Sequence, residues 1–167
     1  TAILLSAVCN FFGASVMCFM GSSVAVSIYN ISGLSDLGDL ALPALGSAMV
    51  SVVLWALIAL KLGLPTSESH ALMAALSGAA VAGGGFSVLN GAEWLKALFG
   101  IVLSTLPVVF LSYFTAHILK TRIGFMQNSF KRLQVLGAAL SSFSHGAQDG
   151  QKLAGVLTLA SALGSNN

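Results

Sequence analysis

Long apolar runs separated by short polar breaks dominate this chain of 167 residues. The first run covers about residues 2–28, the second about residues 40–60 and the third about residues 94–118. At a rise of ~1.5 Å per residue, each run is long enough to cross the ~30 Å hydrocarbon core of a bilayer as a helix. The pattern therefore predicts at least three membrane-spanning helices.

The composition points to the same fold class. Hydrophobic residues make up 56% of the chain and charged residues only 7%, whereas a soluble domain carries about 25% charged residues. The net charge of +2 is too small for a nucleic-acid reader, and no basic stripe alternates with aromatic residues. We therefore expect an all-α, polytopic transmembrane helical bundle that contacts the lipid bilayer and does not bind nucleic acid.

The first conspicuous break is the polar segment 63–70, which contains Pro65. Apolar sequence resumes after it but continues only over residues 71–81 before three consecutive glycines. This short length favours a half-helix over a complete span. A half-helix that begins at Ser69 or His70 would point its free N–H groups back into the break, where they attract an anion.

A second polar interruption, residues 144–152, divides the last apolar stretch. We expect a broken helix here too, with Gly146 just before a half-helix that starts near Asp149. Asp149 and Lys152 are three positions apart, a spacing at which the two side chains can pair. Irregular backbone in a membrane is tolerated only where it is buried in protein or lines a wet cavity. The two breaks are therefore expected to face one shared cavity.

The ionisable groups at these breaks indicate a function. A charged side chain at the centre of a membrane helix costs ~2.5–3.5 kcal/mol on insertion scales. An anion beside Glu68 and Asp149 requires a proton, a cation or a basic partner to neutralise the carboxylates. This requirement would couple the binding of a small oxyanion to the binding of a cation.

The predicted site consists of hydroxyl, amide, imidazole and carboxylate groups at the two breaks. The candidate substrate-binding residues are Thr66, Ser67, Ser69, Gly146, Gln148 and Asp149. The candidate coupling-ion residues are Glu68, Asp149, Gln148 and His145, and the oxygen atoms of Gln148 and Asp149 are candidate ligands for Na⁺. No other cofactor is expected. No catalytic residue is assigned, because a Ser67–His70 nucleophile–base pair would lack a third orienting group.

The most basic part of the chain is the connector 120–132, which carries four basic residues and no acidic one. Because basic loops are enriched on the cytoplasmic side, this connector is expected to be cytoplasmic. Three predicted crossings separate it from Asp36 and Asp39, so the acidic loop is expected on the outer side. Thr1 already borders an apolar run, so we also expect the chain to lack its natural beginning.

Both breaks resemble motifs of the PiT family of inorganic phosphate transporters, which are sodium- or proton-coupled permeases. Residues 63–71 read Gly-Leu-Pro-Thr-Ser-Glu-Ser-His-Ala and match the family's Gly-Leu-Pro-x-Ser-x-x-His-Ala segment. Residues 144–152 are similar to its His-Gly-Ala-Asn-Asp-x-x-Lys segment, with Gln148 in the place of the commoner Asn.

The resemblance implies an internal portion of an inverted-repeat transporter with broken helices or re-entrant half-helices. Residues 1–119 would belong to the first repeat, 120–132 to the cytoplasmic connector and 133–167 to the start of the second repeat. It also implies transport of inorganic phosphate with Na⁺ or H⁺ by alternating access, in the plasma (cell inner) membrane, and no enzymatic activity.

The residues by themselves specify only a small oxyanion, so sulfate stays open as an alternative substrate. A homo-oligomer also stays open. The contrasting hypothesis is a non-transporting helical assembly module, in which both breaks are packing features.

Overall fold

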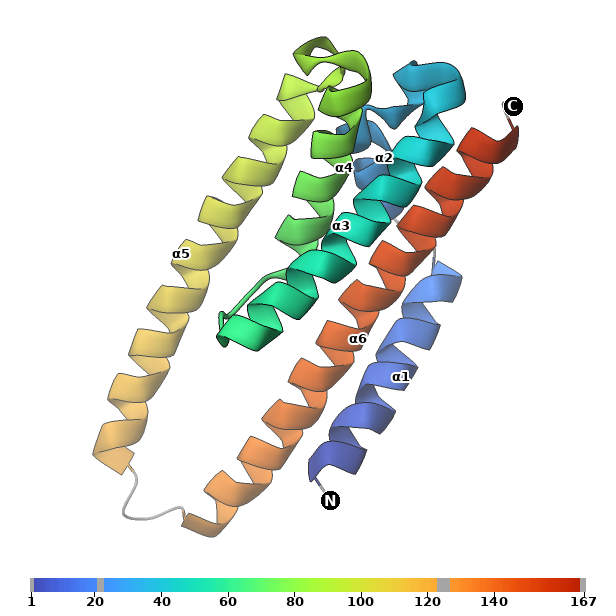
Figure 1. The fold of residues 1–167 in the computed structure, drawn as a ribbon. Coiled ribbons are helices and arrows are strands. Elements are labelled where there is room, and N and C mark those ends of the chain that lie inside the picture. Colours follow the sequence, from blue (N-terminus) through green and yellow to red (C-terminus); the bar gives the residue numbers. More distant parts are fainter. Residues whose placement is uncertain (1, 21–22, 123–126, 166–167) are drawn as a thin grey trace.

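The structure is a computed structural model that describes residues 2–20, 23–122 and 127–165. Within these residues all regular structure is helical, which confirms the expected all-α class (Figure 1). Three stretches are long and apolar enough to cross a membrane: Ala2–Met20, Leu34–Leu62 and Gly91–Lys120. The polytopic membrane architecture is confirmed, and the second and third stretches contain the second and third apolar runs of the sequence. The first run is shorter as a helix than expected, because the helix ends at Met20 and a separate helix covers Ser23–Ser32.

The elements follow one another as α1 (Ala2–Met20), α2 (Ser23–Ser32), the 3-10 helix η1 (Leu34–Leu40), α3 (Ala41–Leu62), α4 (Glu68–Gly84), the 3-10 helix η2 (Phe86–Val88), α5 (Gly91–Arg122) and α6 (Gln127–Ser165). In Figure 1, α3 runs downward, α4 returns upward and α5 runs downward again. η1, which carries Asp36 and Asp39, lies at the upper end, and the neighbouring ends of α5 and α6 lie at the lower end. The acidic and basic segments are therefore at opposite ends of the bundle, as the predicted number of crossings requires.

Most of the expected connector 120–132 is helical. α5 continues to Arg122 and α6 begins at Gln127, so Lys120 belongs to one helix and Lys131 to the other. Residues 123–126 of the connector lie outside the described residues.

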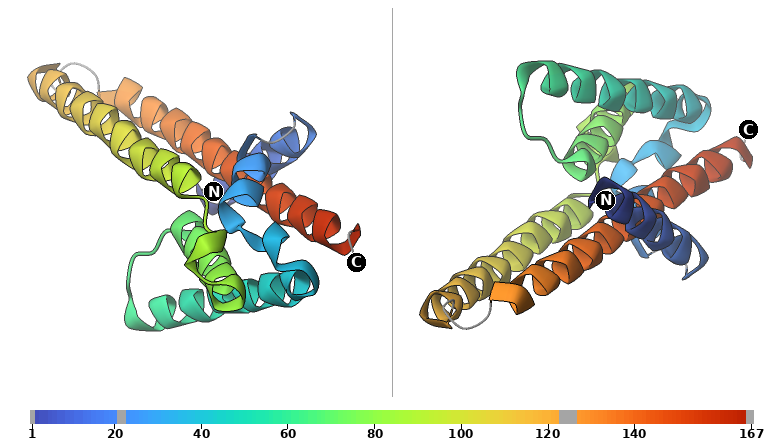
Figure 2. Two further views of the ribbon diagram at one scale, coloured as in Figure 1. Left: turned by 90° about the horizontal axis from the view of Figure 1, so that it is seen from above. Right: turned by 90° about the horizontal axis from the view of Figure 1, so that it is seen from below.

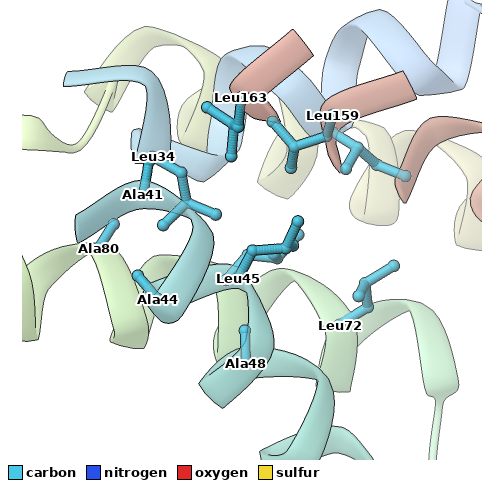
Figure 3. Packing of buried hydrophobic residues seen from close by; sticks show 11 residues of the cluster. Leu34, Ala41, Ala44, Leu45, Ala48, Leu72, Ala80, Leu159 and Leu163 are labelled. Carbon is cyan, nitrogen blue, oxygen red and sulfur yellow. The ribbon is translucent and has the colours of Figure 1, made fainter. Parts of the chain in front are cut away.

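Helix α6 is the centre of the arrangement. α1 packs on one side of it, and α3 with α4 lie on the other side (Figure 2). The core forms where α3, α4, η1 and the last part of α6 meet, around the fully buried side chains of Leu34 and Leu159 (Figure 3). Leu76 of α4 is fully buried in the same cluster. Because lipid tails are as apolar as leucine, such helices associate through close packing. The buried Ala44 and Ala48 of α3 permit this close packing.

Helix α5 stands apart from this core. Its contacts with the other described elements are mainly with α2, and the apolar window of its candidate span contains no buried residue. Leu103, for example, is 73% exposed. An apolar side-chain surface around a helix whose backbone hydrogen bonds are internal is compatible with lipid contact.

The expected break after the second span is confirmed. Gly63 ends α3 in the left-handed conformation (φ 65°, ψ 27°), which a glycine adopts without a steric penalty. Pro65 disfavours helical backbone at the preceding residue, and residues 64–67 are not helical. α4 then begins at Glu68, one residue before the earlier of its two expected starts, and its 17 residues are fewer than the ~20 that a complete span needs.

The expected break at residues 144–152 is wrong, because α6 passes through this segment as a continuous helix. Polar side chains do not remove backbone hydrogen bonds, and the segment contains no proline. Asp149 therefore lies in the interior of a helix and not at the start of a half-helix.

Glycines of this segment let α1 approach α6. A Cβ atom added at Gly150 would lie 2.7 Å from the carbonyl oxygen of Ala14, and one added at Gly146 would overlap the backbone of Asn10. Gly13 of α1 faces the backbone of Phe143 in the same way. The Gly-x-x-x-Gly spacing in α6 thus serves helix packing.

Candidate functional site

A cavity of about 470 Å³ lies between α3, α4 and α6. Its apolar walls come mainly from α3, and its charged residues come from the start of α4 and the middle of α6. The lining residues are Met49, Val52, Val53, Ala56, Leu57, Glu68, Leu72, Asp149, Lys152, Leu153 and Val156. The cavity differs from the predicted one, because only α4 begins beside it, whereas α6 passes it as a continuous helix. Its described lining includes two carboxylates and one ammonium group.

Glu68 reaches this cavity because α4 begins within the length of α3. It shares the cavity with Ala56 and Leu57, and Leu57 lies five residues before the end of α3 at Leu62. The start of α4 therefore borders the same cavity as a part of α3 that precedes its last turn. Figure 1 shows the non-helical segment that carries the chain back from the lower end of α3 to α4.

Asp149 is held by two basic side chains of its own helix. Lys152 Nζ lies 2.8 Å from Asp149 Oδ1, and His145 Nε2 lies 3.4 Å from Asp149 Oδ2. The side chain of Lys152 is 18% exposed and that of Asp149 is 34% exposed. The expected pair three positions apart is confirmed, so Lys152 is a basic partner that neutralises one of the two carboxylates.

A smaller cavity of about 120 Å³ adjoins the same lysine. It is lined by Ser27, Ile28 and Ile31 of α2, by Ser69, Leu72 and Met73 of α4, and by Lys152 of α6. Lys152 and Leu72 line both cavities. Lys152 therefore borders both the cavity that Glu68 lines and the cavity that Ser69 lines.

Ser67 has a structural role at the start of α4. Its hydroxyl oxygen accepts a hydrogen bond from the backbone N–H of His70 at 3.5 Å, and its carbonyl oxygen accepts one from Ala71 N at 3.0 Å. Ser67 is thus the N-cap of α4. Since helix geometry leaves the first N–H groups without intrahelical partners, the N–H groups of Glu68 and Ser69 point toward the break.

Several predicted site residues lie elsewhere. Gly146 is buried against α1. Thr66, Gln148 and His145 are exposed and are not among the residues that line the two cavities. The larger cavity therefore brings Glu68 and Asp149 together, whereas Ser69 lines the smaller one. Gln148 lines neither cavity, so it does not provide a second oxygen ligand for a cation there.

Sequence reasoning left Lys152 out of the candidate site. Its spacing from Asp149 was a sufficient signal for the ion pair. Its position between the cavities depends on Leu72 and the start of α4, which the spacing does not reveal.

The amino-acid sequence is similar to those of proteins named as transporters. A protein of Bacillus subtilis (strain 168) named "Probable low-affinity inorganic phosphate transporter" is 32% identical over 164 residues, which are 95% of this chain and 48% of that protein. Proteins with the same name from Mycobacterium bovis and Rhizobium meliloti are 32% and 29% identical and cover 95% and 89% of this chain. The chain covers 38% and 46% of those two proteins, so it spans less than half the length of these relatives.

No solved structure matches the chain. A family model described as the Phosphate transporter family matches residues 1–129, which is more than half of the chain. The chain therefore belongs to the phosphate transporter family.

Proposed function

We propose that this chain is part of a transporter that moves inorganic phosphate across a membrane by alternating access, coupled to Na⁺ or H⁺. The names of the relatives support phosphate as the substrate. The observation that carries the proposal is the meeting of Glu68, Asp149 and Lys152 in one cavity beside the start of a half-helix.

The charges around the cavity are suited to an anion that enters with a cation. Two carboxylates face one ammonium group there, which leaves an excess negative charge that repels a lone phosphate. A coupling Na⁺ or proton removes this repulsion, while Lys152 and the N–H groups at the start of α4 provide donors to the anion. The apolar wall from α3 lowers the local dielectric constant and strengthens these interactions.

The two carboxylates also favour phosphate over sulfate. A phosphate ion that keeps a proton has an O–H group, which can donate to an ionised Glu68 or Asp149. Sulfate at neutral pH has no such donor and would only repel the carboxylates. Phosphate is therefore the better chemical match to this cavity.

For the orientation, we propose that the neighbouring ends of α5 and α6 face the cytoplasm. Lys120, Lys131 and Arg132 lie near these ends, and basic residues are enriched at the cytoplasmic ends of membrane spans. η1 with its two aspartates then faces outward. The plasma membrane is the corresponding location.

Uptake of labelled phosphate tests the proposed function directly. Full-length protein reconstituted into proteoliposomes is expected to accumulate phosphate when an inward Na⁺ gradient or a pH gradient is imposed, and excess sulfate is expected to compete weakly. Protein-free liposomes are the control. Failure to take up phosphate under either gradient would favour the non-transporting assembly module.

Ser67→Ala is expected to raise the half-saturating phosphate concentration in this uptake assay. Loss of an N-cap costs a helix about 0.5–2 kcal/mol, and here the cap fixes the first turn of α4 beside the cavity. Ser67→Thr keeps the hydroxyl and the cap and is the matched control. An unchanged half-saturating concentration in Ser67→Ala would show that the cap does not position the phosphate site.

A further inference from the structure

Among the described residues that line the two adjoining cavities, Lys152 is the only basic one. Its side chain is largely buried, with 18% exposure, and its ammonium group is 2.8 Å from Asp149 Oδ1. The pair lines the larger cavity together with Glu68, and Lys152 also lines the smaller cavity together with Ser69. One flexible cation is thus within the reach of both the carboxylate and the space beside the start of α4.

A single ammonium group cannot fully neutralise Asp149 and an anion at the same time. A lysine side chain is a compact point charge on a flexible stem with three donors, so it can reorient by a small movement between neighbouring partners. When it turns toward an anion, Asp149 keeps only His145, at 3.4 Å from its Oδ2 atom. The carboxylate then becomes a favourable position for a small cation.

We propose that Lys152 is a positioning cation shared by Asp149 and the transported anion, so that anion binding releases Asp149 to bind the coupling cation. In the empty cavity the ion pair with Lys152 competes with a cation for Asp149. When the anion is bound, this competition ends. The inference rests on the proposed function and specifies how the anion and the cation are coupled at that site.

The coupling is reciprocal, because two ligands that favour each other do so by the same factor in both directions. A cation on Asp149 frees Lys152 for the anion, just as the anion frees Asp149 for the cation. Removing either member of the pair should abolish the coupling. Only the loss of Lys152 should also weaken the binding of the anion itself.

Equilibrium binding of labelled inorganic phosphate to purified full-length protein tests this scheme. The dissociation constant is measured with and without Na⁺ at constant ionic strength, and at two pH values, to identify the cation that strengthens phosphate binding in the wild-type protein. Lys152→Gln is expected to weaken phosphate binding by about tenfold or more, a loss of at least ~1.4 kcal/mol, and to remove most of the strengthening by the cation. Asp149→Asn is expected to bind phosphate without the cation at least as tightly as the wild-type protein does with it.

The chain offers a matched control in the pair Lys96–Glu93, which has the same spacing and an N–O distance of 2.6 Å but is not among the residues lining the cavities. Lys96→Gln is expected to leave phosphate affinity and its cation dependence unchanged. Lys152→Arg keeps the charge and is expected to restore phosphate binding toward the wild-type value. Lys96→Gln controls for the loss of an ion pair of this spacing, and Lys152→Arg tests whether the positive charge at this position is what strengthens phosphate binding.

The outcomes separate the inference from the proposed function. If Lys152→Gln binds phosphate with the affinity and cation dependence of the wild-type protein, the inference is overturned and the proposed function is not. The same holds if Asp149→Asn loses as much phosphate affinity as Lys152→Gln. Absence of cation-strengthened phosphate binding in the wild-type protein would overturn both. If Lys152→Gln does not fold, the double variant Asp149→Asn/Lys152→Gln replaces it, because it contains no unpaired charge from this pair. We expect the double variant to bind phosphate weakly and without cation dependence. Tight phosphate binding by the double variant would overturn the inference.

Discussion

Asp149→Asn is expected to eliminate the whole cation-stimulated component of phosphate uptake while leaving the protein inserted in the membrane and folded. Asparagine has nearly the same volume as aspartate but carries no charge. The substitution therefore removes the group that pairs with Lys152 at 2.8 Å and that the proposed mechanism assigns to the coupling cation. Phosphate can still bind to the ammonium group of Lys152, but a gradient of the cation no longer drives phosphate accumulation.

Proteoliposomes with and without the cation gradient measure this effect, and thermal unfolding of the purified variant establishes that it is folded. Glu93→Gln is the matched control, because Glu93 belongs to the comparable pair at the start of α5. It should retain wild-type accumulation. Ion dependence in Asp149→Asn equal to that of the wild-type protein would remove Asp149 from the coupling mechanism.

The membrane spans could be predicted from the sequence because the bilayer imposes a minimum length on them. The runs that became α1, α3 and α5 each contain an apolar stretch of the required length. The break after α3 was equally predictable, because Pro65 and Gly63 act on the backbone itself: one disfavours helical backbone and the other adopts the left-handed turn.

The segment 144–152 was misinterpreted because its signal comes from side chains. Polar residues and glycines are typical of a break, but the backbone of α6 keeps its helical hydrogen bonds through all of them. The spacing of Gly146 and Gly150 was the informative feature, since small residues four positions apart mark a surface for a neighbouring helix. Which helix would pack there is not encoded in that spacing.

Only part of the candidate site could be predicted, because the chemistry of a side chain does not reveal the direction in which it points. The free-energy cost of a charged side chain in a membrane pointed to Glu68 and Asp149, and both residues line one cavity. Gln148 was chosen because its amide oxygen is a suitable cation ligand. On a helix, however, it points about 100° away from its neighbour Asp149, and its side chain is exposed. Sequence reasoning that predicted a broken helix at 144–152 could not apply this angular restriction.

Gly146→Leu is expected to separate α1 from α6 and to destabilise the protein by about 3 kcal/mol or more, the upper end of the range for overpacked sites. A side chain at this position meets the backbone of Asn10, and a backbone cannot move aside as a flexible side chain can. Leucine is a much better helix former than glycine, so the intrinsic propensity of α6 rises. Any loss of stability must therefore come from the contact with α1.

Gly137→Leu is the control in the same helix, because a Cβ atom there meets nothing within 4 Å. The unfolding temperature of this variant should equal or exceed that of the wild-type protein.

Packing of α1 on α6 can be followed separately through Ser6 and Ser142, whose hydroxyl oxygens are 3.0 Å apart. With Cys9 and Cys18 replaced by alanine, cysteines introduced at these two positions should form a disulfide readily in the Gly137→Leu background and poorly in the Gly146→Leu background. Efficient cross-linking and an unchanged unfolding temperature in Gly146→Leu would show that α1 does not depend on the glycine surface of α6, because only the close contact of the two backbones makes the added side chain costly.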